Sequence, residues 1–403
     1  MAVNANVDLV YFNAGGGHRA AAIALRDMLV QQQRPWTVRL VNLTDVLDRR
    51  QRFRRATGLA PEDLYNRRLQ RGWTLGLGAE LKLLQALIRA AHRPLSRTLQ
   101  AHWAATRPDL VVSLIPNFNR AMGAALAAAR PGVPFVTVLT DMADLPPRFW
   151  VEPAVRQHVV CGTPHAQQQA LAAGVPAERV SLVSGMLLRP GFYELPALDR
   201  AGARAALGLH PDRPTAAVMY GGQGSMDMLR IAQLLPNLQL LLFTGHNRQL
   251  AARLQALQAV PGAAARAVVG FTPDVPQLMR LADFFIGKPG PGAMSEALHL
   301  GLPVLTFDNA WTMPQERFNT RWVRELGVGL VLRSAAELPA AVDQLLRHLG
   351  EFQARVGWLD NRAVFEVPEI LAELLQIATR RQPLALPAPQ AASTAPSLSL
   401  HEA

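Results

Sequence analysis

Lysine and cysteine are scarce in this chain of 403 residues. Cys161 is its single cysteine, so no disulfide can form within the chain, and the apolar residues around it predict a buried side chain. Only Lys82 and Lys288 are lysines among the 41 basic residues. Lys288 lies in a loop rich in glycine and proline, and this loop is therefore the first candidate for a functional site.

Long apolar runs are also absent. No stretch of about 18 apolar residues occurs, so we expect no transmembrane helix. The N-terminus lacks a basic segment followed by a long apolar core, so we expect no secretory signal and a cytosolic location as the default. Half of the residues are hydrophobic and 18% are charged, and the length exceeds one ordinary core, which predicts a globular chain of two domains.

The excess of positive charge is concentrated near the N-terminus. The net charge is +11, and residues 49–97 contain 12 Arg or Lys against three Asp or Glu. Basic residues beside Trp73 and several leucines suit contact with an anionic membrane surface, although a solvated helix with one face on the core has the same pattern. We expect no nucleic-acid partner, because aromatic residues make up only 6% and no compact recognition motif occurs.

Short apolar runs alternate with helix-like segments along most of the chain. This alternation predicts an α/β protein with two Rossmann-like, doubly wound parallel sheets. The polar segment near 190–200 is the expected boundary between them. The expected parts are an N-terminal domain (1–195), a C-terminal domain (200–350), helices that pack back toward the N-terminal domain (351–380) and a disordered tail (381–403).

The loop that contains Lys288 follows a strand-like run, Asp283–Ile286, and precedes a helix-like run, Ala293–Leu300. Backbone N–H groups at such a helix start favour a phosphate group. The loop residues assigned to this role are Lys288, Pro289, Gly290, Pro291 and Gly292. Glu296 is expected in the first turn of the helix that follows.

Several motifs together resemble one family. Gly15-Gly16-Gly17-His18 is similar to the N-terminal loop of the diacylglycerol glycosyltransferases, and Thr140-Asp141 with Trp150 is similar to a strand-end segment of that family. Residues 287–298, followed by Gly301-Leu302-Pro303 and Gln315-Glu316, resemble its donor-binding signature. This family comprises the plant-type monogalactosyldiacylglycerol synthases and bacterial processive glucosyltransferases, which are related to MurG.

The resemblance implies the GT-B architecture, in which two Rossmann-like domains face each other across a cleft. It also implies an inverting transfer of a hexose from a UDP-sugar to a lipid hydroxyl, with diacylglycerol or a glycolipid as acceptor. The enzyme would then lie on the cytoplasmic face of the membrane as a peripheral protein. We expect a UDP-sugar as donor substrate, no cofactor and no metal, because the chain has no Asp-x-Asp pair.

Two residues compete for the role of general base on the acceptor hydroxyl. His18 follows three glycines at a strand-to-helix turn, where it is either a base or a cap of its own helix. Asp141 follows another strand, where it is either a base or a turn aspartate. The two would also work as a pair. The residues expected to line the acceptor and phosphate side are Gly15, Gly16, Gly17 and Arg189.

The donor would be held by the second half of the chain. By resemblance, Glu296 accepts hydrogen bonds from the ribose hydroxyls, and Gln315 and Glu316 bind the sugar hydroxyls. Phe271 and Thr272 would meet the base. The residues expected to line the diphosphate are Gly222, Gly224, His246 and Asn247, with Lys288 adding positive charge.

Other functions stay open from the sequence. The same donor site would serve a transferase with a soluble acceptor, or a nucleotide-sugar hydrolase or epimerase. A nucleotide-sugar binding protein without activity is disfavoured, because His18, Asp141, Glu296 and Gln315 are all present.

Overall fold

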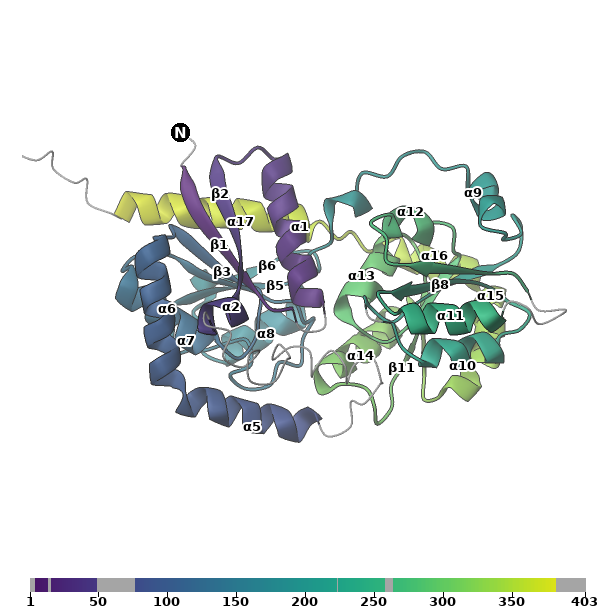
Figure 1. The fold of residues 1–403 in the computed structure, drawn as a ribbon, viewed down its shortest axis with the longest axis horizontal. Coiled ribbons are helices and arrows are strands. Elements are labelled where there is room, and N and C mark those ends of the chain that lie inside the picture. The colour runs from purple at the N-terminus through teal and green to yellow at the C-terminus, as the bar shows by residue number, and fades with distance from the viewer. Residues whose placement is uncertain (1–3, 14–15, 49–76, 223, 258–263, 382–403) are drawn as a thin grey trace, which may run out of the picture.

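The computed structural model describes residues 4–13, 16–48, 77–222, 224–257 and 264–381. Figure 1 shows two α/β halves side by side, with the N-terminal half on the left. Each half contains a six-stranded sheet, and every strand pairing is parallel. The predicted α/β class with two doubly wound sheets is therefore confirmed.

The N-terminal sheet has the strand order β2-β1-β3-β4-β5-β6. Its central strands are buried throughout, as expected for apolar runs covered by helices on both faces. Cys161, the last residue of β5, is fully buried as predicted. The strands are β1 (Ala5–Tyr11), β2 (Trp36–Asn42), β3 (Leu110–Ser113), β4 (Phe135–Val138), β5 (Gln157–Cys161) and β6 (Val180–Leu182).

Helices cover both faces of this sheet. One core contains residues of α1 and α17, and the core on the opposite face contains residues of α2, α6 and α7. The helix α5 extends from the lower edge of this half in Figure 1. The helices are α1 (Gly17–Gln31), α2 (Leu43–Leu47), α5 (Leu77–Ala90), α6 (His92–Thr106), α7 (Asn119–Ala129) and α8 (Pro164–Ala172).

The C-terminal sheet has the order β12-β11-β10-β7-β8-β9. Between the sheets the chain passes through the short helices η2 (Pro190–Phe192) and α9 (Arg200–Ala206). The strands are β7 (Thr215–Met219), β8 (Gln239–Gly245), β9 (Arg266–Gly270), β10 (Phe284–Gly287), β11 (Val304–Phe307) and β12 (Gly329–Leu332). Their connections include α10 (Asp227–Leu234), α11 (Arg248–Ala256), α12 (Val275–Met279), α13 (Pro291–His299), η4 (Pro314–Glu316), α14 (Arg317–Leu326) and α15 (Leu338–Arg347).

The last described helix returns to the N-terminal half. After α16 (Leu349–Val356), helix α17 (Ala363–Arg381) packs its apolar side into the core beneath α1 and β1. The side chains that do so recur every four residues, at Ala363, Val367, Leu371 and Leu375. Before this helix, the Asn361 amide donates to the carbonyl of Met186 (2.9 Å), which ties the crossing segment to the N-terminal half.

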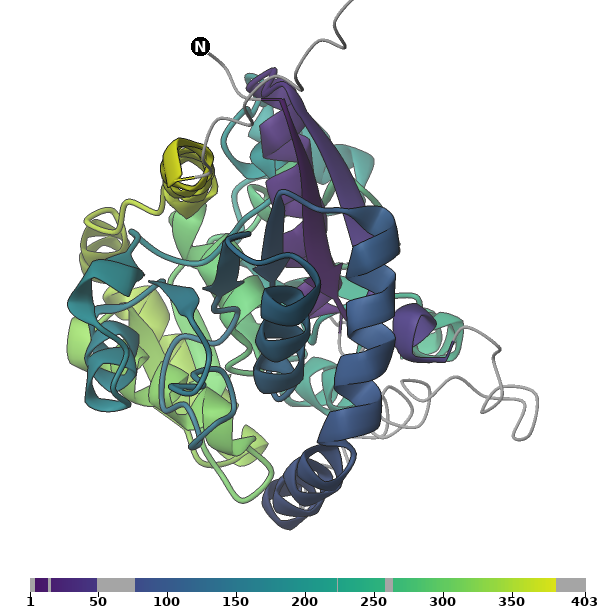
Figure 2. The same cartoon turned by 90° about the vertical axis from the view of Figure 1, so that its left-hand side faces the viewer.

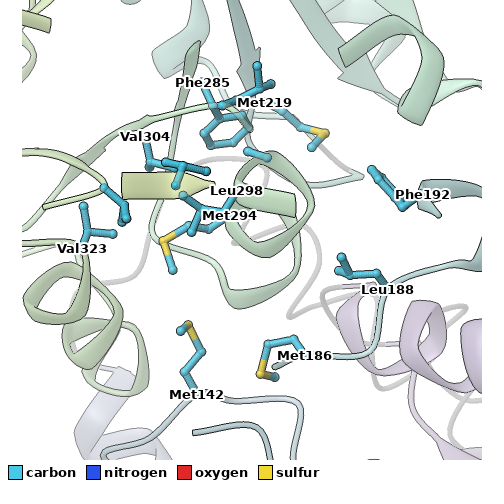
Figure 3. Close-up of a cluster of buried hydrophobic side chains, with 14 of the residues drawn as sticks. Met142, Met186, Leu188, Phe192, Met219, Phe285, Met294, Leu298, Val304 and Val323 are labelled. Carbon is cyan, nitrogen blue, oxygen red and sulfur yellow. The ribbon is translucent and has the colours of Figure 1, made fainter. Parts of the chain in front are cut away.

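One apolar cluster joins the two halves. It contains Met142 and Met186 from the N-terminal half and Met219 and Met294 from the C-terminal half. Figure 3 shows Met142 directed toward Met294, with Met186 beside Met142 in the lower part of the view. Methionine side chains adapt easily to small shifts, so this contact suits two halves that move relative to each other.

Candidate functional site

The order of the strands places both predicted loops at switch points. In each sheet the strand order reverses once, between β1 and β3 in the first and between β7 and β10 in the second. Ligands of open parallel sheets bind beyond the carboxyl ends of the strands at such a point. The loop before His18 follows β1, and the loop 288–290 follows β10, so both lie where a ligand is expected.

His18 is held over the ends of neighbouring strands. It is the second residue of α1, whose N-cap is Gly16 in the left-handed region (φ 85°), and no side chain caps this helix. Its Nδ1 atom lies 3.0 Å from the hydroxyl oxygen of Thr140, which follows β4. The ring therefore reaches past β3 to the end of β4 and does not cap its own helix.

Asp141 lies beside the same ring without a direct hydrogen bond to it. Its carboxylate accepts a hydrogen bond from the indole N–H of Trp150 (2.7 Å), and the Trp150 ring lies edge-on to His18 with centroids 6.1 Å apart. We call His18, Thr140, Asp141 and Trp150 the N-terminal cluster. Within it, the indole ring contacts both candidate bases.

A buried amide fixes the backbone of Trp150. Asn119, at the start of α7, donates to the carbonyls of Trp150 (2.8 Å) and Ile115 (3.2 Å) and accepts from the Ser113 hydroxyl (2.6 Å). All its partners lie near the carboxyl end of β3 or in the loop before β5. This network holds the indole, and through it the Asp141 carboxylate, in one place.

Burial displaces both pKa values in the N-terminal cluster toward the neutral form. Burial lowers the pKa of His18 to about 4, and a hydrogen bond to the backbone of Leu114 opposes this shift. Burial raises the pKa of Asp141 to about 6, with Glu316 raising it further while Trp150 and Lys288 oppose the shift. At neutral pH the ring is then neutral and the carboxylate is mostly ionised.

The loop of residues 287–292, which we call the C-terminal loop, is held from behind by buried polar groups. The Thr306 hydroxyl donates to the carbonyl of Gly287 (2.9 Å), and the buried Asn319 amide donates to the carbonyl of Pro289 (2.7 Å). Gly287 has no room for a side chain, since a Cβ there would lie 2.4 Å from the carbonyl oxygen of Met219 on β7. The loop is therefore fixed before any ligand arrives.

Lys288 forms an ion pair with Glu316. Its Nζ atom lies 2.8 Å from a carboxylate oxygen of Glu316, whose side chain is 6% exposed. Glu316 precedes α14 and closes the short helix η4, and Gln315 beside it is half-buried. Because both ions of this pair affect the pKa of Asp141, the two ends of the sheets act on each other electrostatically.

The helix after the C-terminal loop starts earlier than the sequence indicated. Helix α13 begins at Pro291 with Gly290 as N-cap, and no acidic residue lies in its first turn. The expectation that Glu296 lies in the first turn is thus wrong, because proline occupies the first helical position and shifts the start by two residues. Burial raises the pKa of Glu296 to about 7, and the charge of Arg189 opposes this shift.

The predicted diphosphate residues lie on two neighbouring loops. The N–H of His246 donates to the carbonyl of Gly222 (3.0 Å). Gly245 has a left-handed backbone (φ 56°), and a Cβ there would lie 2.2 Å from the same carbonyl oxygen. Gly224 ends the first loop, also in the left-handed region. The side chain of Asn247 caps α11 by accepting from the N–H of Leu250 (2.9 Å).

Phe271 and His246 form an exposed aromatic surface. Their rings stack with centroids 4.0 Å apart and planes inclined by 19°, and Phe271 is 68% exposed. Thr272 next to it exchanges hydrogen bonds with Asp274 at the start of α12. The stack provides a flat face that a nucleobase would cover, whereas the hydroxyl of Thr272 is engaged within its own turn.

Arg189 and the glycines before His18 complete the predicted residues. The Arg189 guanidinium lies over the ring of Phe192 (5.5 Å) on the segment between the two sheets, and Gly17 opens α1. Gly15 and residues 49–76, which hold most of the predicted membrane segment, lie outside the described residues.

Sequence reasoning missed a contact between the two halves. Asp144 accepts from Arg321 of α14 (3.3 Å) and lies 3.3 Å from His165 Nε2 of α8. His165 also stacks on Phe318 of α14 with ring centroids 5.0 Å apart. No sequence signal identifies the two pairs that cross between the halves, Asp144 with Arg321 and His165 with Phe318, because their partners are more than 150 residues apart.

A separate hollow of about 630 Å³ lies at the carboxyl ends of β11 and β12. Its lining includes the ion pair of Arg324 and Asp308. None of the predicted site residues belongs to it. Among the described residues, no group of three or more His, Cys, Asp or Glu is arranged to hold a metal ion, and none of the helices has the length and apolar character to span a bilayer.

Curated proteins similar to the chain share one name. A probable monogalactosyldiacylglycerol synthase of Glycine max is 27% identical over 291 residues, covering 67% of this chain and 53% of its own length. The monogalactosyldiacylglycerol synthase of Spinacia oleracea is 27% identical over 252 residues, covering 59% of this chain and 46% of its own length. The chain thus spans about half the length of these relatives. No protein-family model matches the chain.

Solved structures support the architecture. MurG of Acinetobacter baumannii matches 92% of this chain and 99% of its own with a TM-score of 0.57 at 15% identity. UGT89C1 of Arabidopsis thaliana, solved with UDP, matches 92% of this chain and all of its own with a TM-score of 0.59 at 15% identity. At such identities the likeness concerns the fold. The chain is thus a homologue of the monogalactosyldiacylglycerol synthases and has the GT-B fold of MurG-like glycosyltransferases.

Proposed function

We propose that the protein is an inverting glycosyltransferase that moves a hexose from a UDP-sugar to a lipid hydroxyl, with diacylglycerol or a glycolipid as acceptor. One observation carries this proposal. The N-terminal cluster, which holds two candidate bases, lies next to the C-terminal half, because Asp144, three residues after Asp141, accepts from Arg321 (3.3 Å) on α14, the helix that begins directly after Glu316. A transferase needs this juxtaposition of a base and an anion-binding loop.

The donor would lie against the C-terminal loop. The start of α13 presents backbone N–H groups at Gly292 and Ala293, because Pro291 has none, and Lys288 adds a positive charge. These groups would neutralise the departing diphosphate without a metal ion. The stacked rings of His246 and Phe271 would carry the base, and the Glu296 carboxylate would accept hydrogen bonds from the ribose.

Both candidate bases are in a form that accepts a proton at neutral pH. The pKa of Asp141, raised to about 6, lies nearer to the working pH than that of His18, lowered to about 4. A base whose pKa is close to the ambient pH is the more effective one. Asp141 is therefore our first assignment for the base, with His18 orienting the acceptor hydroxyl; the reverse assignment predicts a different pH profile.

The lipid acceptor is inferred from the relatives and from the surface of α5. The curated relatives are named as synthases of a galactolipid. In this chain α5 exposes leucines and basic side chains, which suit the cytoplasmic surface of an anionic membrane. The enzyme would then be a peripheral membrane protein that takes its acceptor from the bilayer and needs no cofactor.

A single experiment tests the proposal. The purified protein is incubated with a panel of UDP-sugars, with and without vesicles that contain diacylglycerol, and the release of UDP is measured. We expect release with one hexose donor that requires the diacylglycerol. Release that is equally fast without lipid would instead identify a transferase with a soluble acceptor, a hydrolase or an epimerase.

A further inference from the structure

Helix α5 exposes a row of leucines. Leu83, Leu84 and Leu87 are 62%, 45% and 57% exposed. The opposite side of the helix is attached to the protein, since Leu81 packs against the cluster that joins the two halves and the Gln85 amide lies 3.2 Å from the Asn117 side-chain oxygen. The outer face of α5 is thus apolar although the helix is firmly placed.

Exposed basic side chains lie within and after this leucine row in the sequence. Between Leu81 and Arg97 the chain has no acidic residue, and its four basic side chains are all exposed. They are Lys82, Arg89, Arg93 and Arg97. Exposed leucines among cations fit the interfacial zone of an anionic bilayer. A second copy of the chain fits less well, because each copy carries a net charge of +11 and would present the same basic row.

A tryptophan of the C-terminal half lies on the same side of the molecule. Trp311 is 52% exposed in the connection between β11 and η4. A tight turn holds it there: the N–H of Trp311 donates to the Asn309 side chain (2.9 Å), and the N–H of Asn309 donates to the Thr312 hydroxyl (3.0 Å). Figures 1 and 2 both show this connection at the lower edge of the molecule, as they show α5.

We propose that Trp311 is a second membrane contact, so that both halves of the protein meet the same lipid surface. The inference rests on the proposed lipid acceptor. An indole ring is favoured at the interface between headgroups and acyl chains, where its N–H stays wet. Gln315 and Glu316 follow Trp311 in the next turn of chain. A Trp311 ring inserted at this depth therefore sets the sugar-binding end of the C-terminal half at the level of the headgroups.

The test compares Trp311→Phe with Trp358→Phe as a matched control. Trp358 is 82% exposed but lies between α16 and α17, away from α5. Each protein is mixed with vesicles of zwitterionic phospholipid, anionic phospholipid and diacylglycerol, some with brominated acyl chains, and tryptophan emission is recorded. We expect a blue shift and bromine quenching for the wild type and for Trp358→Phe, and a clear reduction of both signals for Trp311→Phe, with Trp73 of the basic segment 49–97 as the source of the remainder. Trp311→Ala is expected to raise the lipid concentration for half-maximal binding about tenfold.

The outcomes separate this inference from the proposed function. If vesicles bind and UDP release requires lipid, but Trp311→Phe is quenched like the wild type, the second contact is wrong and the proposed function stands. If the wild type neither binds vesicles nor needs lipid for UDP release, both are wrong. An emission shift that depends on protein concentration without vesicles would identify an interface between copies and would also overturn the inference.

Discussion

The ends of the two sheets hold their polar groups in opposite ways. In the N-terminal cluster, His18 and Asp141 contact neutral partners, the Thr140 hydroxyl and the Trp150 indole, and burial moves both pKa values toward neutral forms. Beside the C-terminal loop, Lys288 and Glu316 form a close ion pair. One end is suited to exchanging a proton, and the other is suited to holding fixed charge against an anion.

Glu296 is an exception on the C-terminal side. Within the part of the chain that the structure describes, no side chain forms a hydrogen bond or ion pair with its carboxyl group, and burial raises its pKa to about 7 despite the nearby charge of Arg189. A half-ionised carboxyl group would become fully ionised when ribose hydroxyls donate to it. The comparison between the two ends therefore predicts that ligand binding, and not the fold, completes the C-terminal site.

The largest effect should follow from removing the carboxylate that we propose as the base. We expect Asp141→Asn to lower kcat about 10²–10⁴-fold, because the amide cannot take the proton, while UDP affinity stays close to that of the wild type. His18→Ala should lower kcat less and should raise the KM for the lipid. Steady-state UDP release and UDP binding by calorimetry would measure these changes.

The pH profile decides between the two candidates. If Asp141 is the base, kcat/KM of the wild type for the lipid, measured at saturating UDP-sugar, rises with pH up to about 6 and then levels off, because only the carboxylate accepts a proton. A profile that levels off near pH 4 would instead assign the base to His18, whose pKa burial lowers to about 4. Retention of normal turnover by Asp141→Asn would remove the first assignment altogether.

The second prediction concerns the fixed charges. Lys288→Met should weaken UDP-sugar binding by roughly 10- to 70-fold, because a charge-assisted contact of about 1.5–2.5 kcal/mol is lost. It should also lower the free energy of unfolding by about 1–3 kcal/mol, since the buried Glu316 carboxylate loses its cation. Denaturant unfolding and calorimetry provide the two measurements.

A double variant separates the two roles of Lys288. Lys288→Met combined with Glu316→Gln removes both charges, so the stability should recover while the donor affinity stays low. If affinity recovered together with stability, Lys288 would serve only to neutralise Glu316. The C-terminal end would then not differ from the N-terminal cluster in the way we infer.

The comparison also explains what the sequence could predict. Strand-like runs followed by glycine-rich turns predicted both sheets and the placement of His18 and Lys288 at strand ends, because local patterns encode these features. The contact between His18 and Thr140 joins residues 122 positions apart, and the contact between Asp144 and Arg321 joins residues 177 positions apart. Such contacts depend on how the two halves are arranged and on where the strand order reverses within each sheet. No local sequence pattern specifies either of these.

The third prediction tests Glu296 through pH. If ribose hydroxyls bind the carboxylate, UDP affinity should fall by up to tenfold for each pH unit below about 7, and Glu296→Gln should abolish this dependence. The raised pKa also means that the folded protein binds this proton more tightly than the unfolded chain. Its contribution to stability is present below pH 4.5 and is lost as the pH rises through about 7. A pH-independent affinity in the wild type would contradict the ribose assignment.

The smallest effect is expected at the contact between the halves. Arg321 pairs with Asp144 across the two halves at 3.3 Å, and Arg324 pairs with Asp308 within the C-terminal half at the same distance, with each arginine 48% exposed. Exposed pairs contribute about 0.2–1 kcal/mol, so both alanine variants should have nearly normal stability.

The two arginines should differ in their effect on activity. If the Asp144–Arg321 pair helps to align the N-terminal cluster with the C-terminal loop, Arg321→Ala should lower kcat/KM by about two- to fivefold, because a loss of up to about 1 kcal/mol corresponds to a change of that size. Arg324→Ala should leave kcat/KM unchanged, and added salt should reduce the wild type toward the Arg321→Ala value. Equal effects of the two substitutions would show that the alignment of the halves depends on the apolar cluster alone.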